Sequence, residues 1–91
     1  MPKSYMVYGD KLQEEILHDT YPEFSEYSLV DMEFAVVVDD RYSCVLVDNN
    51  GELFGGQSVK DPVALLRFLA SIGTKIKSEG IDVTSEFRVK L

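Results

Sequence analysis

The sequence predicts one α+β domain over residues 1–91, with helices packed on a small antiparallel-rich sheet and elements in the order β-α-β-β-β-α-β. Three observations predict this class. Apolar residues recur at helical spacing in two segments, after Asp10 and after Asp61. Between these segments, short apolar runs are separated by turn residues, as in a series of strands. Apolar and polar residues then alternate along the end of the chain, which is typical of a strand with one wet face.

The first predicted elements are a strand at Ser4–Tyr8 and a short amphipathic helix that ends by Thr20. Asp10 can cap this helix, and Gln13 stands three residues later, as in a capping box. The narrow apolar stripe of the helix consists of Leu12, Ile16 and Leu17. Residues 21–31 show no clear period, so we expect a loop there that includes at most one turn of helix.

Three strands are expected next, at Met32–Val38, Tyr42–Val47 and Glu52–Ser58. In the first two strands both alternating sets of side chains are apolar, so both faces of the sheet should be covered. Gly55 and Gly56 predict a bulge or a close backbone approach in the third strand. The face that the first helix must cover carries Ala35, Val37, Val45 and Val47. If it stays uncovered, a second copy of the chain would bury it, which predicts a possible homodimer.

A second helix is expected from Asp61 to Ile76. Asp61 suits the cap and Pro62 suits the first helical position, which together give a strong start signal. Gly73 can end this helix early, and Gly80 suits the residue just past its end. Its apolar face consists of Leu65, Leu66, Leu69, Ile72 and Ile76, widened by Val63 and Phe68.

The tail, residues 81–91, is expected to be the last strand. Its apolar positions are Ile81, Val83, Phe87, Val89 and Leu91, with Ser85 as the one polar exception. Polar residues alternate with them, so one face of this strand should be buried and the other should be wet.

Composition excludes several classes of protein. Hydrophobic residues make up 45% of the chain and charged residues 27%, which fits a folded domain and not a disordered segment. No apolar run approaches the length of a membrane span, and no secretory signal is visible. The single cysteine, Cys44, cannot form an internal disulfide, so we expect a cytoplasmic protein.

The net charge of −7 is unevenly placed along the chain. Residues 1–54 hold 12 acidic and 3 basic residues, whereas residues 55–91 hold 4 acidic and 6 basic residues. Contact with a nucleic-acid backbone needs a basic surface, so direct nucleic-acid binding is not expected. An acidic half suits either a basic protein partner or simple solubility.

The stretch VDNNGELFGG has the residue types of a calcium loop but not its spacing. That loop requires glycine at position six and glutamate at position twelve. With Gly51 at position six, Gln57 falls at position twelve; with Asp48 at position one, Leu53 falls at position six. Asn50 and Gly51 between apolar runs are instead a common signal for a tight hairpin. We therefore expect a turn here and no calcium site.

Other polar groups do not converge on a site for chemistry. Asp39 and Asp40 are neighbours at a strand end, where two carboxylates could act as an acid–base pair. Adjacent strand residues point to opposite faces, however, so we expect these two to belong to a turn. His18 is the only histidine, and the sequence lacks the cysteine and histidine spacing of a zinc site. The glycines before Lys60 lack the spacing of a phosphate-binding loop. A Ser-His-Asp triad meets only in space and stays open, although no motif signals one. The sequence predicts no enzymatic activity, no cofactor and no metal.

The feature that carries a functional hypothesis is the placement of all five tyrosines in the acidic half. Tyrosine is enriched at protein interfaces because it offers a large contact area and a hydrogen-bonding tip. Glu14 and Glu15, as neighbours on a helix, are expected on a solvated face. The predicted partner-binding residues are Glu14, Glu15, Asp19, Tyr21, Glu23, Glu26, Tyr27, Asp31, Asp39 and Asp40.

The predicted function is that of a small acidic protein-binding module. One concrete form is an inhibitor or immunity-type protein that docks on the basic, nucleic-acid-binding surface of an enzyme. The alternatives are a homo-oligomeric structural or assembly protein and, third, a small enzyme or ligand-binding domain, for which no site chemistry converges. In a further alternative the tyrosines belong to the core and the acidic residues only confer solubility.

Overall fold

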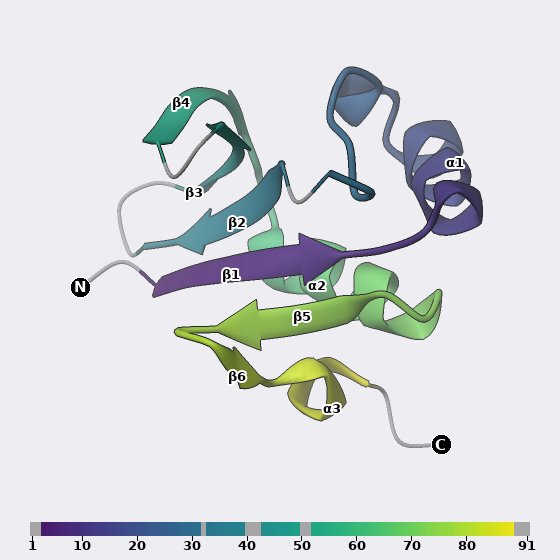
Figure 1. The fold of residues 1–91 in the computed structure, drawn as a ribbon, viewed down its shortest axis with the longest axis vertical. Coiled ribbons are helices and arrows are strands. Elements are labelled where there is room, and N and C mark those ends of the chain that lie inside the picture. The colour runs from purple at the N-terminus through teal and green to yellow at the C-terminus, as the bar shows by residue number, and fades with distance from the viewer. Residues whose placement is uncertain (1–2, 32, 40–42, 50–51, 89–91) are drawn as a thin grey trace.

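The computed structural model describes residues 3–31, 33–39, 43–49 and 52–88, whose strands form one antiparallel sheet (Figure 1). Across these residues the sheet has six strands in the order β4-β3-β2-β1-β5-β6. The strands are β1 (Lys3–Tyr8), β2 (Phe34–Val38), β3 (Ser43–Asn49), β4 (Glu52–Ser58), β5 (Lys75–Ser78) and β6 (Ile81–Asp82). The helices are α1 (Lys11–Thr20), the 3-10 helix η1 (Pro22–Phe24), α2 (Pro62–Ser71) and α3 (Thr84–Phe87). The predicted α+β class is confirmed.

The first helix begins where its capping signal predicts. The Asp10 carboxylate accepts the backbone N–H of Gln13 at 2.8 Å, and the Gln13 side-chain oxygen accepts the N–H of Asp10 at 2.9 Å. These reciprocal bonds form the predicted capping box. The loop expected at 21–31 includes η1 as its one helical turn.

The strands β3 and β4 contain the predicted bulge. Val45 pairs with Gln57 but Val47 pairs with Phe54, so β4 carries one extra residue between these pairs, where Gly55 and Gly56 lie. The turn predicted at residues 50–51 lies outside the described residues, as do residues 40–41 of the turn predicted after β2.

The second helix is shorter than predicted. It ends before Gly73, which has a φ of +93°, a conformation that glycine adopts without strain. Ile76, predicted on the helix, lies on β5, which pairs with β1. The prediction was wrong because Ile72 and Ile76 are four residues apart, a spacing that suits a continuing helix. The buried residues Thr74, Ile76 and Ser78 instead alternate, which is the period of a strand.

The prediction of a tail strand is wrong after its first two residues, which form β6. The Asp82 carboxylate accepts both the N–H (2.9 Å) and the hydroxyl (2.7 Å) of Thr84, so it holds a turn from which α3 begins. Val83 and Phe87 are four residues apart, and both pack against the core. Gly80, with a φ of +80°, serves the turn between β5 and β6 and does not end a helix. Residues 89–91 lie outside the described residues.

The core lies on one face of the sheet, and α2 covers it from behind in the view of Figure 1. Three central strands and α2 supply fully buried side chains: Val7, Val36, Ile76, Leu65, Leu66 and Leu69. Full burial of one such side chain contributes about 1.5–3 kcal/mol relative to exposure. The helix α2 is therefore a principal source of the stability of the fold.

The other face of the sheet bears on the predicted homodimer. Ala35 and Val37 are buried within the chain itself. In the backbone register, Val45 pairs with Val36 and Val47 pairs with Phe34, whereas Ala35 and Val37 pair with other residues of β3. The register therefore does not group these four residues as predicted, and the argument for a homodimer through that face loses its basis. Dimerisation itself stays a prediction.

Candidate functional site

Eight of the ten residues predicted to bind a partner lie between Glu14 and Asp31, in α1, in η1 and in the loop beyond. The two helices contact each other at one end of the sheet, past the end of β1 (Figure 1). Asp39 follows β2 at the opposite end of the sheet, because the last residue of β2 pairs with the first residue of β1. The fold therefore does not bring Asp39 to the other predicted residues, and Asp40 lies outside the described residues.

Glu14 is a buried residue, and the expectation that it faces solvent is wrong. Its side chain is 5% exposed. One carboxylate oxygen accepts the backbone N–H of Leu29 at 2.9 Å, and the other accepts the ammonium of Lys11 at 2.7 Å. Burial alone would raise its pKa, but hydrogen bonds from Lys11, Ser28 and Leu29 outweigh burial and lower the pKa to about 2. Glu14 is thus charged at neutral pH and ties the loop around Leu29 to α1.

Tyr21 and Tyr27 are half-buried in an aromatic cluster that fastens η1 to the domain. The ring of Tyr21 lies 5.8 Å from that of Phe24 and 5.4 Å from that of Phe68 on α2. The ring of Tyr27 stacks on Phe24 at 6.0 Å and meets Phe34 edge to face at 6.2 Å. Such pairs contribute about 0.5–1.5 kcal/mol each beyond area burial. The tyrosines therefore hold the η1 segment in place and offer a partner only part of their surface.

Five of the predicted carboxylates at this end of the molecule are exposed: Glu15, Asp19, Glu23, Glu26 and Asp31. In the described ranges of the chain, the one ion pair joins Lys11 to Glu14, so none of the five has a cation partner there. Crowded like charges repel each other and cost the folded state some stability, and a cationic partner would relieve this repulsion.

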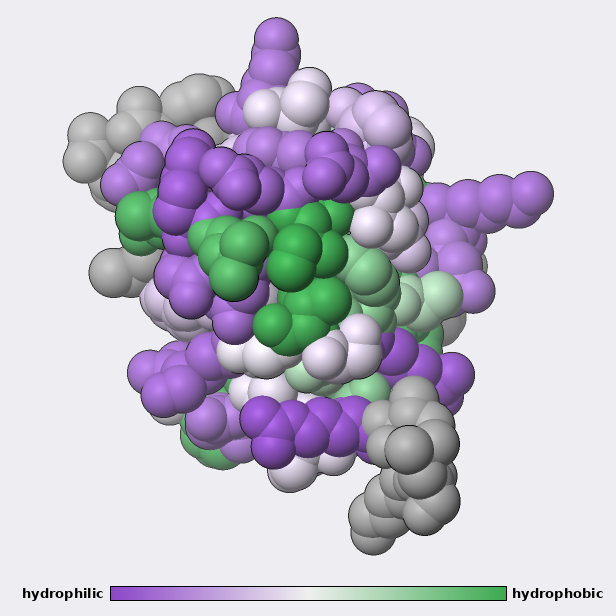
Figure 2. All heavy atoms as spheres, turned by 90° about the vertical axis from the view of Figure 1, so that its right-hand side faces the viewer, coloured by the Kyte–Doolittle hydropathy of each residue, from purple (hydrophilic) through white to green (hydrophobic). Residues whose placement is uncertain are grey.

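An apolar patch that the sequence analysis missed lies between α1 and the end of α2. Leu12 is 65% exposed, and Ile16, one helical turn later, is half-buried. The side-chain amide of Gln13 donates to the carbonyl of Ile72 at 3.2 Å, which brings half-buried Ile72 alongside α1. Figure 2 views the end of the molecule that carries α1 and shows hydrophobic side chains gathered in the middle, with hydrophilic ones around them. We call Leu12, Ile16 and Ile72 the α1–α2 patch.

The sequence contained a signal for the exposure of Leu12. Leu17 is fully buried and Glu14 nearly so, and these two residues mark the face of α1 that meets the core. Leu12 is five residues before Leu17, which places it about 140° around the helix. Two residues so far apart around a short helix do not both lie on its buried face. Because Leu17 is on that face, Leu12 is left exposed.

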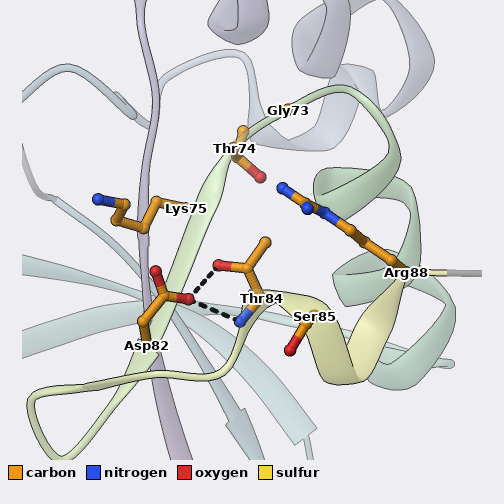
Figure 3. A pocket seen from close by; sticks show the side chains of 7 residues that line it. All are labelled: Gly73, Thr74, Lys75, Asp82, Thr84, Ser85 and Arg88. Carbon is orange, nitrogen blue, oxygen red and sulfur yellow. Dashed lines mark hydrogen bonds between the residues drawn. The ribbon is translucent and has the colours of Figure 1, made fainter.

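A surface pocket of about 340 Å³ lies between β5, β6 and α3 (Figure 3). Its buried hydroxyls are engaged, since Thr74 donates to a backbone carbonyl and Thr84 donates to Asp82. These bonds from Thr84 lower the pKa of Asp82, and a carboxylate with a lowered pKa is a poor general base. Figure 3 shows Arg88 reaching across the pocket and Lys75 pointing away from it. The pocket has exposed cations but no arrangement for acid–base catalysis.

Another pocket, about 260 Å³, lies between η1 and the start of α2, and we call it the η1–α2 pocket. Its lining combines two aromatic rings, two carboxylates and two apolar side chains: Tyr21, Phe24, Glu23, Asp61, Val59 and Ala64. Tyr21 also contacts Phe68 of α2, the residue one helical turn before Ile72. The pocket and the α1–α2 patch are therefore connected through Tyr21 and Phe68.

The single histidine helps to hold the loop after η1. Nε2 of His18 lies 2.7 Å from the carbonyl oxygen of Tyr27. Among the residues that the structure describes, no three or more His, Cys, Asp and Glu side chains are grouped so as to hold a metal ion. Within the same residues, none of the helices combines the length and hydrophobicity that a bilayer span requires.

Comparison with known proteins gives no match. No protein-family model matches the chain, no curated protein matches it, and no solved structure matches it. Function is therefore inferred from the site itself.

Proposed function

We propose that the chain is a small acidic protein-binding module that docks on a basic protein surface and has no enzymatic activity of its own. The observation that carries this proposal is the α1–α2 patch, where Leu12 is exposed, together with exposed carboxylates that lack a cation partner in the described chain. Protein interfaces commonly join an apolar centre, which supplies affinity, to a polar and charged rim.

Different residues of α1 supply the apolar centre and the charged rim. Glu15 and Asp19 follow Leu12 by three and seven residues, so all three share the outer side of the helix. Leu12 would be the apolar anchor, because side chains that lose water on docking contribute most of the affinity. The carboxylates would steer a basic partner and raise its association rate, an effect that salt screens over about 8–10 Å.

The acidic rim extends from α1 into the η1 segment through Glu23 and Glu26. Carboxylates spaced along a surface imitate the charge of a phosphate backbone. An enzyme's nucleic-acid-binding surface is therefore a suitable partner, and the role would be that of an inhibitor or immunity-type protein.

Self-association through the same patch is the competing proposal. It would bring together two acidic rims that belong to chains with a net charge of −7 each. Like charges across an interface oppose association, whereas a basic partner removes that cost. A monomer mass in solution at micromolar concentration would favour the binding module, and a stable dimer would favour the assembly role instead.

The test compares two variants that change equally exposed apolar residues. Leu12 is 65% exposed on α1 and Ile81 is 66% exposed on β6, so Leu12→Gln removes the anchor and Ile81→Thr is the matched control. Each replacement suits its local structure, since Gln favours helices and Thr favours strands. Proteins of the native host are captured with each variant at low and at high salt.

The expected result is a basic partner that the parent and Ile81→Thr retain at low salt and that Leu12→Gln loses. With the purified partner, Glu23→Lys combined with Glu26→Lys should slow association and flatten its salt dependence. Equal capture by Leu12→Gln and Ile81→Thr, together with an unaltered association rate after charge reversal, would show that this end of the molecule is only a soluble surface.

A further inference from the structure

The η1–α2 pocket is sized for a single side chain. Its volume is about 260 Å³, whereas pockets that hold free small molecules measure about 300–1,000 Å³. It opens beside the acidic η1 segment, at the end of the molecule where we place the docking face. The pocket lies at the start of α2 and the α1–α2 patch at its end, and Tyr21, which lines the pocket and contacts Phe68 of α2, lies between them.

The aromatic wall of this pocket suits a flat cation. The half-buried ring of Tyr21 offers the open part of this wall, and the buried ring of Phe24 packs against it with ring centres 5.8 Å apart and an inclination of 30°. Phe24 is buried, and its contacts with Tyr27 and Phe34 fix its position before any ligand arrives. A guanidinium is attracted by the negative face of such rings and stacks on it.

The carboxylates of the pocket are available to a cation. Asp61 caps α2 by accepting the N–H of Ala64 at 3.0 Å through Oδ1. This is the one hydrogen bond of the carboxylate within the described ranges, so Oδ2 is left to bind another donor. Glu23 is exposed and forms no ion pair in the same ranges. Lys60 also lines the pocket, but across the described residues it pairs with neither carboxylate. The charge of Asp61 also offsets the partial positive charge at the start of α2, which would otherwise oppose a cation.

We infer that the η1–α2 pocket receives an arginine side chain of the partner. The methylene stem lies against Val59 and Ala64, the guanidinium stacks on the aromatic wall, and its N–H groups bind the carboxylates of Glu23 and Asp61. Arginine fits better than lysine because its planar fork stacks and pairs with a carboxylate at the same time. This inference rests on the proposed function for its partner, but the pocket can be tested without one.

The test uses N-acetyl-arginine amide as the probe and nuclear magnetic resonance as the measurement. N-acetyl-citrulline amide, which has nearly the same shape without the charge, is the control ligand. We expect saturable, millimolar binding of the arginine probe, with shifts centred on the methyl groups of Val59 and Ala64 and on the ring of Tyr21. Equal shifts with citrulline, or shifts that do not saturate, would overturn the inference.

Two conservative variants locate the binding. Glu23→Gln keeps the side-chain shape, and Asp61→Asn keeps a good helix cap, so both variants should fold like the parent. Each should weaken arginine binding by about 1.5- to fivefold, the scale of one exposed ion pair. Glu15→Gln, which changes a carboxylate of α1 outside the pocket, should leave it unchanged. Equal binding by Glu23→Gln, Asp61→Asn and the parent would overturn the inference.

Measurements of partner binding by these variants distinguish a failure of this inference from a failure of the proposed function. If Leu12→Gln abolishes docking while Glu23→Gln and Asp61→Asn leave the dissociation rate unaltered, the docking face stands and the arginine pocket is overturned. If the arginine probe binds in the pocket but no variant of the α1–α2 patch affects any partner, the pocket stands and the proposed docking face is overturned.

Discussion

The two longer helices begin alike and then take different roles. Both α1 and α2 have ten residues, and each starts at an aspartate whose carboxylate accepts the N–H three residues later. The helix α2 buries four apolar side chains, whereas α1 buries one apolar side chain, Leu17, and one charged side chain, Glu14. Equal start signals therefore do not imply equal roles. The buried face decides whether a helix builds the core or presents a surface.

The largest expected effect comes from the buried face of α2. Leu69 is fully buried, so Leu69→Ala should reduce the free energy of unfolding by about 2–5 kcal/mol, measured by urea denaturation. Small domains have about 5–15 kcal/mol in total, so this loss is a large fraction of the stability. Val63→Ala on the same helix is the control, because Val63 is exposed and should matter by less than about 0.5 kcal/mol. Equal losses in the two variants would mean that α2 does not build the core.

The next effect comes from the charged residue that α1 buries. Glu14→Ala leaves the N–H of Leu29 without its acceptor, which should cost about 1–3 kcal/mol in the same measurement. Glu15→Ala changes the exposed neighbour and should shift the unfolding free energy by less than about 0.5 kcal/mol. If the two variants unfold at the same denaturant concentration, the carboxylate of Glu14 does not tie the loop to α1.

Acid should remove the contribution of Glu14 progressively. Its pKa is lowered to about 2 in the folded chain from an ordinary value of 4.5. A group with a depressed folded pKa stabilises fully above its unfolded pKa and loses that contribution as pH falls toward the folded value. The stability difference between the parent and Glu14→Ala should therefore be constant above about pH 5.5 and shrink by about 1–3 kcal/mol by pH 2. A difference that stays constant over this range would contradict the lowered pKa.

The smallest expected effect on stability comes from the exposed face of α1. Leu12→Gln should change the unfolding free energy by less than about 0.5 kcal/mol, because Leu12 is largely exposed. Thermal and urea unfolding of this variant should match those of the parent. A loss as large as that of Leu69→Ala would show that Leu12 belongs to the core and cannot serve as a docking anchor.

Local signals predicted the start of each long helix well. Asp10 with Gln13, and Asp61 with Pro62, identified both helix starts because a cap needs only residues within one turn. The structure of the end of α2 and of the tail was harder to predict. Apolar residues four apart suit a helix, but apolar and polar residues also alternate in the same segments, which suits a strand. Pairing with β1 selected the strand for Ile76, and the bonds between Asp82 and Thr84 selected the turn before α3. The pairing with β1 depends on a contact that no local pattern contains, whereas the bonds between Asp82 and Thr84 are local, and the Asp-x-Thr pattern was a signal for that turn.

The candidate site was predicted in part. The sequence indicated an acidic segment, and the fold brings most of it to one end of the molecule. It did not show which carboxylate is buried, because Glu14 and Glu15 are neighbouring residues of the same type. What distinguishes them is the hydrogen bond from the N–H of Leu29, in the loop beyond η1, to Glu14. It also did not show the α1–α2 patch, since Ile72 reaches α1 only after α2 has packed on the sheet.

The place of β1 in the sheet has a consequence for how the chain folds. The strand lies between β2 and β5, and Val7 pairs with Ile76 near the other end of the described chain. During synthesis β1 is made before both of its partners, and β5 is made after α1, β2, β3, β4 and α2. One edge of β1 therefore stays unpaired in the growing chain and is open to pairing with other chains. Closing so long a loop also slows folding, and pulsed hydrogen exchange during refolding should show late protection of the amides shared by β1 and β5.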